Sequence, residues 1–416
     1  MKTPSLTSPP FSASHQAQAA APPAAPTVSQ ALAQRIGQAV RDQGGRIGFD
    51  TFMALALYTP GLGYYAADLP KFGAMPAAPG GAPGSDFVTA PEISPLFGYA
   101  LARQVAQALQ ATGTDELWEF GAGTGALAEQ VLSALQEMQV PLARYTIVDV
   151  SGSLRARQQS RLAPFGDQVQ WASELPAQMR GVVLGNELID AMPVQLLARV
   201  GGVWHERGVA LAAAPASASA GTALGTGDAA DGTPPAIDVF AWSDRPTALR
   251  PPVEIEGDHD YLTEIHPQSE AFVRTLAQRL ERGAVFLLDY GFPEAEYYHP
   301  QRHMGTVMCH QAHRSDADPL VRVGEKDITA HVNFTGLALA AQDAGLEVLG
   351  YTSQAHFLIN CGLVDLMQAA ALPVRASAQR LILEHEMGEL FKVIALGVGA
   401  PWQPLGFGQG DRTHRL

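Results

Sequence analysis

Apolar and polar positions alternate with two different periods along this chain. Val28, Leu32, Ile36 and Val40 recur at helical spacing and a Gly-Gly pair follows them, so residues 27–44 are predicted to form an amphipathic helix. Further along, short apolar runs alternate with longer runs of helical period. The predicted strands are 117–120, 145–150, 169–172, 181–184, 284–289, 346–351 and 391–397, and the predicted helices are 126–138, 153–162, 269–280 and 334–344. This alternation predicts an α/β fold with a doubly wound parallel sheet.

Three segments lack this periodicity. Residues 1–26 are mostly Ala, Pro, Ser and Gln, a composition that buries too little apolar surface to fold, so they are predicted to be a disordered tail. Residues 212–236 are rich in Ala, Ser, Gly, Thr and Pro and are predicted to be a flexible surface insertion, and residues 75–84 resemble them.

Charge and cysteine content narrow the function classes. The chain carries 27 Lys and Arg against 41 Asp and Glu, a net charge of -14, which argues against a nucleic-acid partner because phosphate binding needs clustered positive charge. The 2 cysteines, Cys309 and Cys361, are far apart and support neither a disulfide framework nor a cysteine-based zinc site. No apolar run is long enough for a membrane span, and no signal peptide is visible. We therefore expect a cytoplasmic, bacterial-type chain.

The strongest local motif is a glycine-rich turn between a predicted strand and a predicted helix. It contains Gly121, Gly123 and Gly125, and this context suits a nucleotide-containing ligand at the helix N-terminus. Because Ala126 follows, the turn also satisfies the GxGxxA pattern of NAD sites. Glu119, two residues before the first glycine, favours S-adenosyl-L-methionine, since a carboxylate there suits a cationic amino-acid group and not a pyrophosphate. The terminal strand, helical insertion and strand also resemble the edge hairpin of class I methyltransferases.

Acidic residues follow the next two strands. Asp149 is placed to accept hydrogen bonds from ribose hydroxyls, which NAD sites also use, or to cap the following helix. Asn186, Glu187 and Asp190 follow the strand at 181–184. If these residues form a helical turn, Glu187 and Asp190 share one face and could bind a guanidinium and help to remove its proton, although capping and solvent exposure are the alternative reading.

Ordered motifs over most of the chain resemble one family, the bacterial and mitochondrial MidA-type methyltransferases that include an arginine methyltransferase acting in complex I assembly. The motifs are Leu57-Tyr58-Thr59-Pro60, Gly63-Tyr64-Tyr65, the stretch 86–94, Leu96-Phe97-Gly98, the stretch 119–125, Asn186-Glu187, Asp190-Ala191, Asp289-Tyr290-Gly291, Gly305-Thr306, the stretch 327–332, Met387-Gly388 and Phe391-Lys392-Val393. Ser85, Asp149 and Asn333 depart from the usual Gly, Glu and Asp of the family, and Asn333 removes a charge.

The resemblance implies a seven-stranded class I methyltransferase (Rossmann-like) sheet that binds S-adenosyl-L-methionine, with an N-terminal helical segment and a helical substrate-facing insertion. It also implies a protein arginine as acceptor, in the mitochondrial relatives a complex I core subunit. The expected divisions are a helical segment and pocket lid at 27–114, the core at 115–300, a substrate-facing region at 301–345, edge strands with a helical insertion at 346–400, and a tail at 401–416.

Other candidate residues are less specific. In the family the stretch with Thr89, Glu92 and Ser94 lies near the cofactor, although it could simply cap the helix that follows. His331 could act as a base, since a histidine changes charge near neutral pH, or could be structural. His299, His303, His310 and His313 lie close to Cys309, but their spacing fits no metal motif and methyl transfer needs no metal. Two alternatives to an active methyltransferase remain, an NAD-dependent oxidoreductase and a non-catalytic assembly factor that binds S-adenosylmethionine.

Overall fold

A computed structural model describes residues 27–67, 88–149, 152–212, 238–311 and 314–416. Its centre is a sheet in which strands lie in the order β4, β3, β2, β5, β10, β16, β15. Their bounds are Val169–Ala172 (β4), Arg144–Val148 (β3), Glu116–Phe120 (β2), Met179–Asn186 (β5), Leu280–Phe292 (β10), Phe391–Gly397 (β16) and Glu347–Ser353 (β15). The first five run parallel, whereas β16 is antiparallel to both of its neighbours. The predicted seven-stranded sheet and its edge hairpin are therefore confirmed, with the short β14 (Val332–Asn333) added beside the end of β10.

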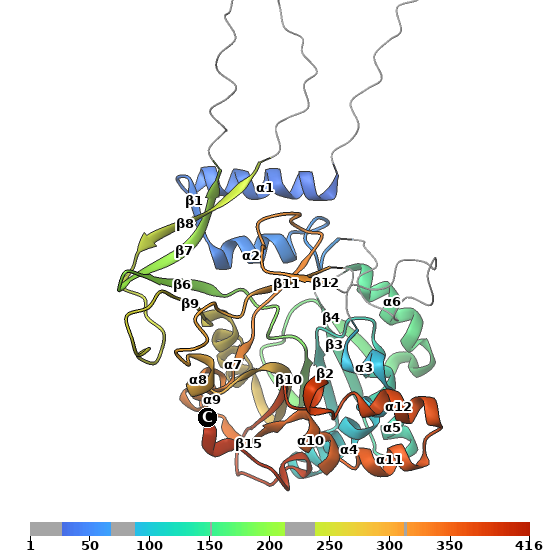
Figure 1. Cartoon of the computed structure of the whole chain (residues 1–416). Helices are drawn as coiled ribbons and strands as arrows, with labels where there is room; N and C mark the ends of the chain where they lie inside the picture. Colours follow the sequence, from blue (N-terminus) through green and yellow to red (C-terminus); the bar gives the residue numbers. More distant parts are fainter. Residues whose placement is uncertain (1–26, 68–87, 150–151, 213–237, 312–313) are drawn as a thin grey trace, which may run out of the picture.

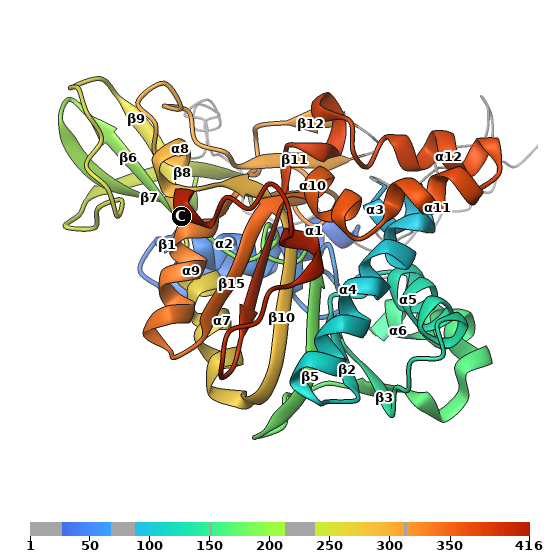
Figure 2. The ribbon, with the colours of Figure 1, turned by 90° about the horizontal axis from the view of Figure 1, so that it is seen from below.

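Helices cover both faces of this sheet, as the doubly wound prediction requires (Figure 2). One face carries α4 (Leu96–Thr112), α5 (Ala126–Glu137) and α6 (Gly152–Leu162), and the other carries α7 (Pro267–Arg279) and α9 (Phe334–Asp343). Each face has its own apolar cluster: Phe97, Leu101 and Val131 lie in one, and Val273 and Leu337 in the other. The parallel strands are buried on both sides, which explains their nearly continuous apolar sequence.

A second, antiparallel sheet lies beside the first, and the sequence analysis did not identify it. It joins β1 (Arg46–Gly48), β7 (Val203–Leu211), β6 (Gln195–Val200) and β9 (Tyr261–Ile265), and β8 (Phe240–Pro246) pairs with β7. The helices α1 (Val28–Asp42) and α2 (Phe49–Tyr58) pack on it through a third apolar cluster (Figure 1). The predicted helix at 27–44 is thus confirmed, and Thr27 and Gln30 form a capping box at its start.

The C-terminal part of the chain returns to the main sheet. Between β15 and β16 lie α10 (Gln354–Asn360), α11 (Leu363–Ala369) and α12 (Leu372–Gln379), which confirms the predicted helical insertion. Residues 401–416 were expected to be a tail, yet they are packed. The Phe407 ring lies 5.5 Å from the Phe357 ring, and Arg412 donates its backbone N–H to the Tyr351 carbonyl at 2.6 Å. A buried aromatic anchor and a backbone hydrogen bond hold this segment on α10 and β15.

Some of the segments named in the sequence analysis cannot be compared with the structure. The predicted disordered tail, the glycine- and proline-rich stretch 75–84, nearly all of the predicted insertion at 212–236, and Ser85 lie outside the described residues. Among the helices of the described ranges, none is long and apolar enough to cross a membrane.

Candidate functional site

The carboxyl ends of the parallel strands face one cavity of about 570 Å³. It lies where β3 and β5 pair with opposite sides of β2, the switch point at which open α/β sheets bind ligands. Predicted site residues that line it are Thr89, Glu92, Glu119, Gly121, Gly123, Asp149, Asn186, Glu187, Asp190 and His331. The other two predicted residues, Ser94 and Gly125, are absent from its wall: Ser94 is buried where α3 (Ala90–Ile93) ends, and Gly125 is the N-cap of α5.

The glycine turn forms one wall of the cavity. Gly121 and Gly123 have φ angles of 66° and 52°, a left-handed backbone that residues with a Cβ rarely adopt, so the turn needs glycine at both positions. A Cβ on Gly121 would also lie 3.1 Å from the side chain of Leu188. Glu119 is the second-last residue of β2, just before this turn, and the hydroxyl of Tyr145 donates to its carboxylate at 2.8 Å. Burial raises the pKa of Glu119 to about 8.

A buried glutamine links the glycine turn to Asp149. Gln158 on α6 donates from Nε2 to the Gly123 carbonyl at 2.9 Å and to the Asp149 carboxylate at 2.8 Å. Its Oε1 accepts a hydrogen bond from Trp171 Nε1 at 2.9 Å. Gln158 thereby ties the ends of β2, β3 and β4 together, and the sequence analysis assigned it no role.

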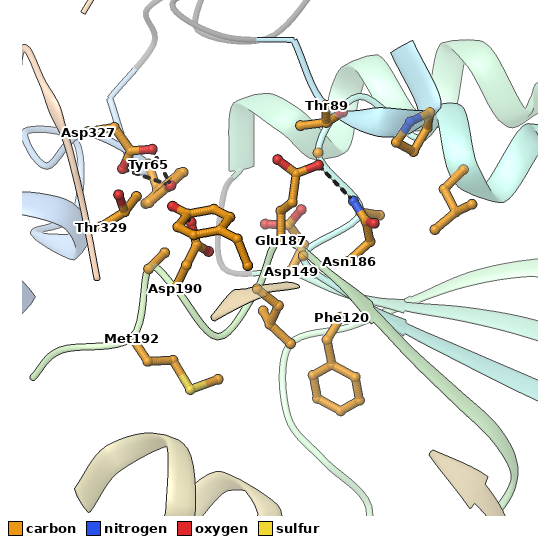
Figure 3. A pocket seen from close by; sticks show the side chains of 18 of the residues that line it. Tyr65, Thr89, Phe120, Asp149, Asn186, Glu187, Asp190, Met192, Asp327 and Thr329 are labelled. Carbon is orange, nitrogen blue, oxygen red and sulfur yellow. Dashed lines mark hydrogen bonds between the residues drawn. The ribbon is translucent and has the colours of Figure 1, made fainter. Parts of the chain in front are cut away.

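The predicted helical turn at Glu187 and Asp190 is wrong, although both side chains do reach the same cavity. Glu187, just after β5, has a left-handed φ of 51°. The turn that follows is irregular because three of its consecutive N–H groups, at 188–190, donate to the carboxylate of Asp289 and not to carbonyls of a helix. Glu187 Oε1 accepts from the Asn186 side chain at 3.1 Å (Figure 3), and it also accepts from the Ala90 N–H at 3.2 Å. A left-handed glutamate costs about 1–2 kcal/mol, which the turn must offset elsewhere.

The two carboxyl groups have different electrostatic surroundings. Burial, reinforced by the charge of Asp190, raises the pKa of Glu187 to about 8. Burial also raises the pKa of Asp190, but only to about 6, because the Tyr290 hydroxyl, which donates to Asp190 Oδ2, and the nearby backbone N–H groups of Ala191 and Asp190 stabilise its charge. Asp190 Oδ1 is buried and accepts no hydrogen bond from the described residues. The pair is therefore an acidic site with one buried oxygen left for a donor.

The far end of the cavity is built by segments to which the sequence analysis gave no definite site role. Tyr58 and Tyr65 stack with ring centroids 5.7 Å apart, and the Tyr65 hydroxyl donates to both oxygens of Asp327 at 2.8 and 3.0 Å (Figure 3). From the sequence, Tyr64 and Tyr65 could either line the pocket or simply pack, and the structure separates the two. Tyr65 lines the cavity, whereas Tyr64 is buried in the apolar cluster beneath α2. The sequence signal that could have distinguished Tyr65 is weak: it follows the glycines Gly61 and Gly63, which mark a turn after the predicted helical residues.

His331 lines this end of the cavity but is a weaker base than expected. Its ring packs edge-on against Tyr290 and Phe292, with both centroids at 5.2 Å. Burial, with the positive charges of Arg302 and Lys392, lowers the pKa of His331 to about 4. The histidine is thus neutral near pH 7, contrary to the expectation that its charge changes there.

Two further expectations concern the stretch before α4 and the histidine-rich segment. The Thr124 hydroxyl and Arg161 both donate to the Glu92 carboxylate, so Glu92 is tied to the glycine turn.

Of the histidine-rich segment, His313 lies outside the described residues. Within the described ranges, no group of three or more His, Cys, Asp or Glu side chains is arranged to hold a metal ion.

Comparison with known proteins decides the family. Residues 100–352 match a family of S-adenosyl-L-methionine-dependent methyltransferases. The chain belongs to this methyltransferase family. A crystal structure of a Burkholderia thailandensis protein bound to S-adenosyl-homocysteine is 43% identical, with a TM-score of 0.82 over 95% of this chain and 100% of that chain. Among curated relatives of this methyltransferase, the mitochondrial protein arginine methyltransferase NDUFAF7 of Danio rerio is 27% identical over 392 residues, 85% of this chain and 83% of the relative. The homolog of Drosophila melanogaster is 26% identical over 354 residues, 76% of this chain and 75% of the relative.

The resemblance drawn from the sequence motifs is thereby confirmed, and the cofactor of this methyltransferase is S-adenosylmethionine, not NAD. The cavity fits that cofactor. S-adenosylmethionine carries an ammonium group, a sulfonium and a ribose with two hydroxyls. Buried Glu119 and the strand-end Asp149 offer carboxylates on either side of the glycine turn. A cationic ligand suits a cavity that is also lined by Glu187, Asp190 and Asp327.

Proposed function

We propose that this methyltransferase transfers the methyl group to an arginine side chain of a protein. The observation that carries the proposal is the carboxyl pair Glu187 and Asp190, which lines the cavity beside the cofactor-binding turn and includes a buried Asp190 oxygen to which none of the described residues donates a hydrogen bond. A guanidinium presents five N–H donors in one plane, and carboxylates bind it through paired hydrogen bonds. The names of the curated relatives, protein arginine methyltransferases, support the same acceptor.

The two carboxyl groups have different proposed roles: Asp190 binds the guanidinium as an anion, and Glu187 acts as the base. Asp190, with the lower pKa, holds the guanidinium and orients one nitrogen. The positive charge of the guanidinium lowers the pKa of Glu187 from about 8, so Glu187 ionises when the acceptor binds. When bound, the cofactor supplies an electrophilic methyl group on its sulfonium. As the new N–C bond forms and the S–C bond breaks, Glu187 takes the proton that leaves the nitrogen.

We propose roles in cofactor binding for the residues at and around the glycine turn, based on their positions in the cavity wall. Glu119 holds the cofactor ammonium, Asp149 holds the ribose hydroxyls, and the Gly121 and Gly123 backbone permits a close approach. His331, with its lowered pKa, is proposed to contact the acceptor as a neutral hydrogen-bond partner. From the family resemblance we further propose that the acceptor protein is a core subunit of respiratory complex I. From the low cysteine content of the sequence we also propose that the enzyme acts in the cytoplasm.

Labelled-methyl transfer into a bacterial lysate tests the acceptor chemistry. The lysate comes from a strain that lacks the enzyme, and labelled proteins are acid-hydrolysed and separated into methylated amino acids. We expect labelled methylarginine from the wild type and none from Glu187→Gln, with S-adenosyl-homocysteine affinity kept in the variant as shown by calorimetry. Label in methyllysine or only in a small molecule would overturn the arginine proposal. Binding of S-adenosyl-homocysteine with no transfer at all would favour the non-catalytic assembly factor.

A further inference from the structure

Two residues near the end of β10, Asp289 and Tyr290, contact the turn that carries Glu187 and Asp190. Asp289 is buried, and its Oδ2 accepts the N–H groups of Leu188, Ile189 and Asp190 at 3.1, 2.8 and 3.2 Å. Its Oδ1 accepts the N–H of Tyr290 at 2.9 Å. One carboxylate therefore holds three consecutive N–H groups of the turn that carries Glu187 and Asp190.

Tyr290, the next residue, contacts the same turn through its side chain. Its hydroxyl donates to Asp190 Oδ2, while its ring packs against His331 and Phe391 with centroids 5.2 and 5.4 Å away. This bond occupies Oδ2, whereas the buried Oδ1 accepts no hydrogen bond within the described part of the chain. The dipeptide thus fixes both the path of the backbone and the direction in which the Asp190 carboxylate points.

We infer that Asp289 and Tyr290 are positioning residues for the acceptor site: Asp289 holds the backbone of the turn, and Tyr290 aims the Asp190 carboxylate at the guanidinium and keeps it ionised. This inference rests on the proposed function of the carboxyl pair. Neither residue needs to touch the methyl group. The turn needs such support because Glu187 leaves β5 in a left-handed conformation, with its own N–H bonded to the Leu288 carbonyl of β10 at 2.9 Å.

The ionisation of Asp190 reflects all of its surroundings. The titratable side chains facing it or the Tyr290 ring are Glu187 from the turn, Asp289 and Tyr290 from β10, Tyr58 and Tyr65 from the N-terminal segment, and Asp327 and His331 from the segment around β13 (Asp327–Thr329). Burial favours the neutral carboxyl of Asp190, whereas the Tyr290 hydroxyl and, to a smaller extent, the backbone N–H groups of Ala191 and Asp190 lower its pKa. Removal of that hydroxyl therefore raises the pKa of Asp190 above about 6.

The test is the pH dependence of kcat/KM for methylation of an arginine-containing acceptor, compared between the wild type and Tyr290→Phe. Activity that needs ionised Asp190 falls as the pH drops, and we expect this acidic limb to move up by about one pH unit in Tyr290→Phe. The deficit should be about tenfold on that limb and clearly smaller at higher pH, where the carboxylate is ionised and only its orientation is affected. Tyr298→Phe is the matched control, since it removes a buried tyrosine hydroxyl that bonds to the Glu264 carbonyl outside the cavity. A loss in Tyr290→Phe that is the same at every pH would overturn the inference.

Two further measurements separate this inference from the proposed function. Chemical-shift titration of labelled aspartate carboxyls, assigned with Asp190→Asn, needs no turnover, and the Asp190 midpoint should rise in Tyr290→Phe. An unchanged midpoint refutes the role of Tyr290 even if no arginine is methylated. Asp289→Asn puts an NH₂ donor where an oxygen now accepts an N–H, so kcat should fall by about tenfold while affinity for S-adenosyl-homocysteine falls less. Equal losses of both would show that Asp289 only maintains the fold. A wild type that methylates no arginine would refute the proposed function alone.

Discussion

Replacing Gln158 by leucine should weaken cofactor binding, although Gln158 is not part of the cavity wall. The substitution removes three hydrogen bonds, to the Gly123 carbonyl, the Asp149 carboxylate and the Trp171 indole. A typical buried hydrogen bond contributes about 1 kcal/mol, so the variant loses about 3 kcal/mol of stability. Two of the bonds orient groups that face the cofactor, and their share of about 2 kcal/mol corresponds to an affinity loss of about 30-fold.

Isothermal titration calorimetry with S-adenosyl-homocysteine measures that loss, and thermal unfolding measures the stability. Gln354→Leu is the matched control: Gln354 is fully buried on α10, donates to the Leu381 carbonyl at 2.9 Å and lies outside the cavity wall. We expect it to lower stability and leave the affinity within about twofold of the wild type. A Gln158→Leu protein that binds the ligand as tightly as the wild type would refute the reasoning, because the glycine turn would then keep its shape without the link.

Three further predictions address the acids and the C-terminal segment. Because the pKa of Glu119 is raised to about 8, wild-type affinity for S-adenosylmethionine should increase as the pH rises from about 6 to about 7.5, and calorimetry should show no such increase for Glu119→Gln. Glu187 binds its proton more tightly folded than unfolded, so it makes the folded state less stable as the pH rises from about 4.5 to about 8; in denaturant titrations Glu187→Gln should gain stability relative to the wild type over that range. Gly350→Ala places a Cβ 2.4 Å from the Phe407 ring and should cost about 2 kcal/mol, measured by thermal unfolding, and expose residues 401–416 to proteolysis.

The main sheet could be predicted because its signals are local. Each parallel strand is buried on both faces and so appears as a short apolar run, and each neighbouring helix shows its own apolar period. The glycine turn, Glu119 and Asp149 lie within a single strand–helix–strand unit whose chemistry is visible in about thirty residues.

The second sheet was missed although one signal was present. Gly201-Gly202 separates two runs of strand-like sequence, and a two-residue glycine turn between such runs is typical of a hairpin. Its other strands come from residues 46–48, 240–246 and 261–265, far apart in sequence, and the low-complexity segment before Phe240 conceals the pairing of β7 with β8. The packed C-terminal segment was missed for a similar reason, since the burial of Phe407 depends on a ring fifty residues earlier.

The two halves of the cavity differ in how the sequence encodes them, and this difference bears on acceptor choice. The proposed cofactor half of the cavity wall comes from the segment 119–127 with Val148, Asp149 and Leu154, whereas the proposed acceptor half combines Tyr58, Tyr65, the segment 187–192, Tyr290 and residues of 306–310 and 327–331. A substitution in the cofactor half changes a local unit that every reaction of the enzyme needs. The acceptor half instead depends on long-range contacts such as Tyr65 to Asp327 and Tyr290 to Asp190, whose members reach the cavity on independent segments. Acceptor preference can therefore change by substitutions in these segments while S-adenosylmethionine binding is kept.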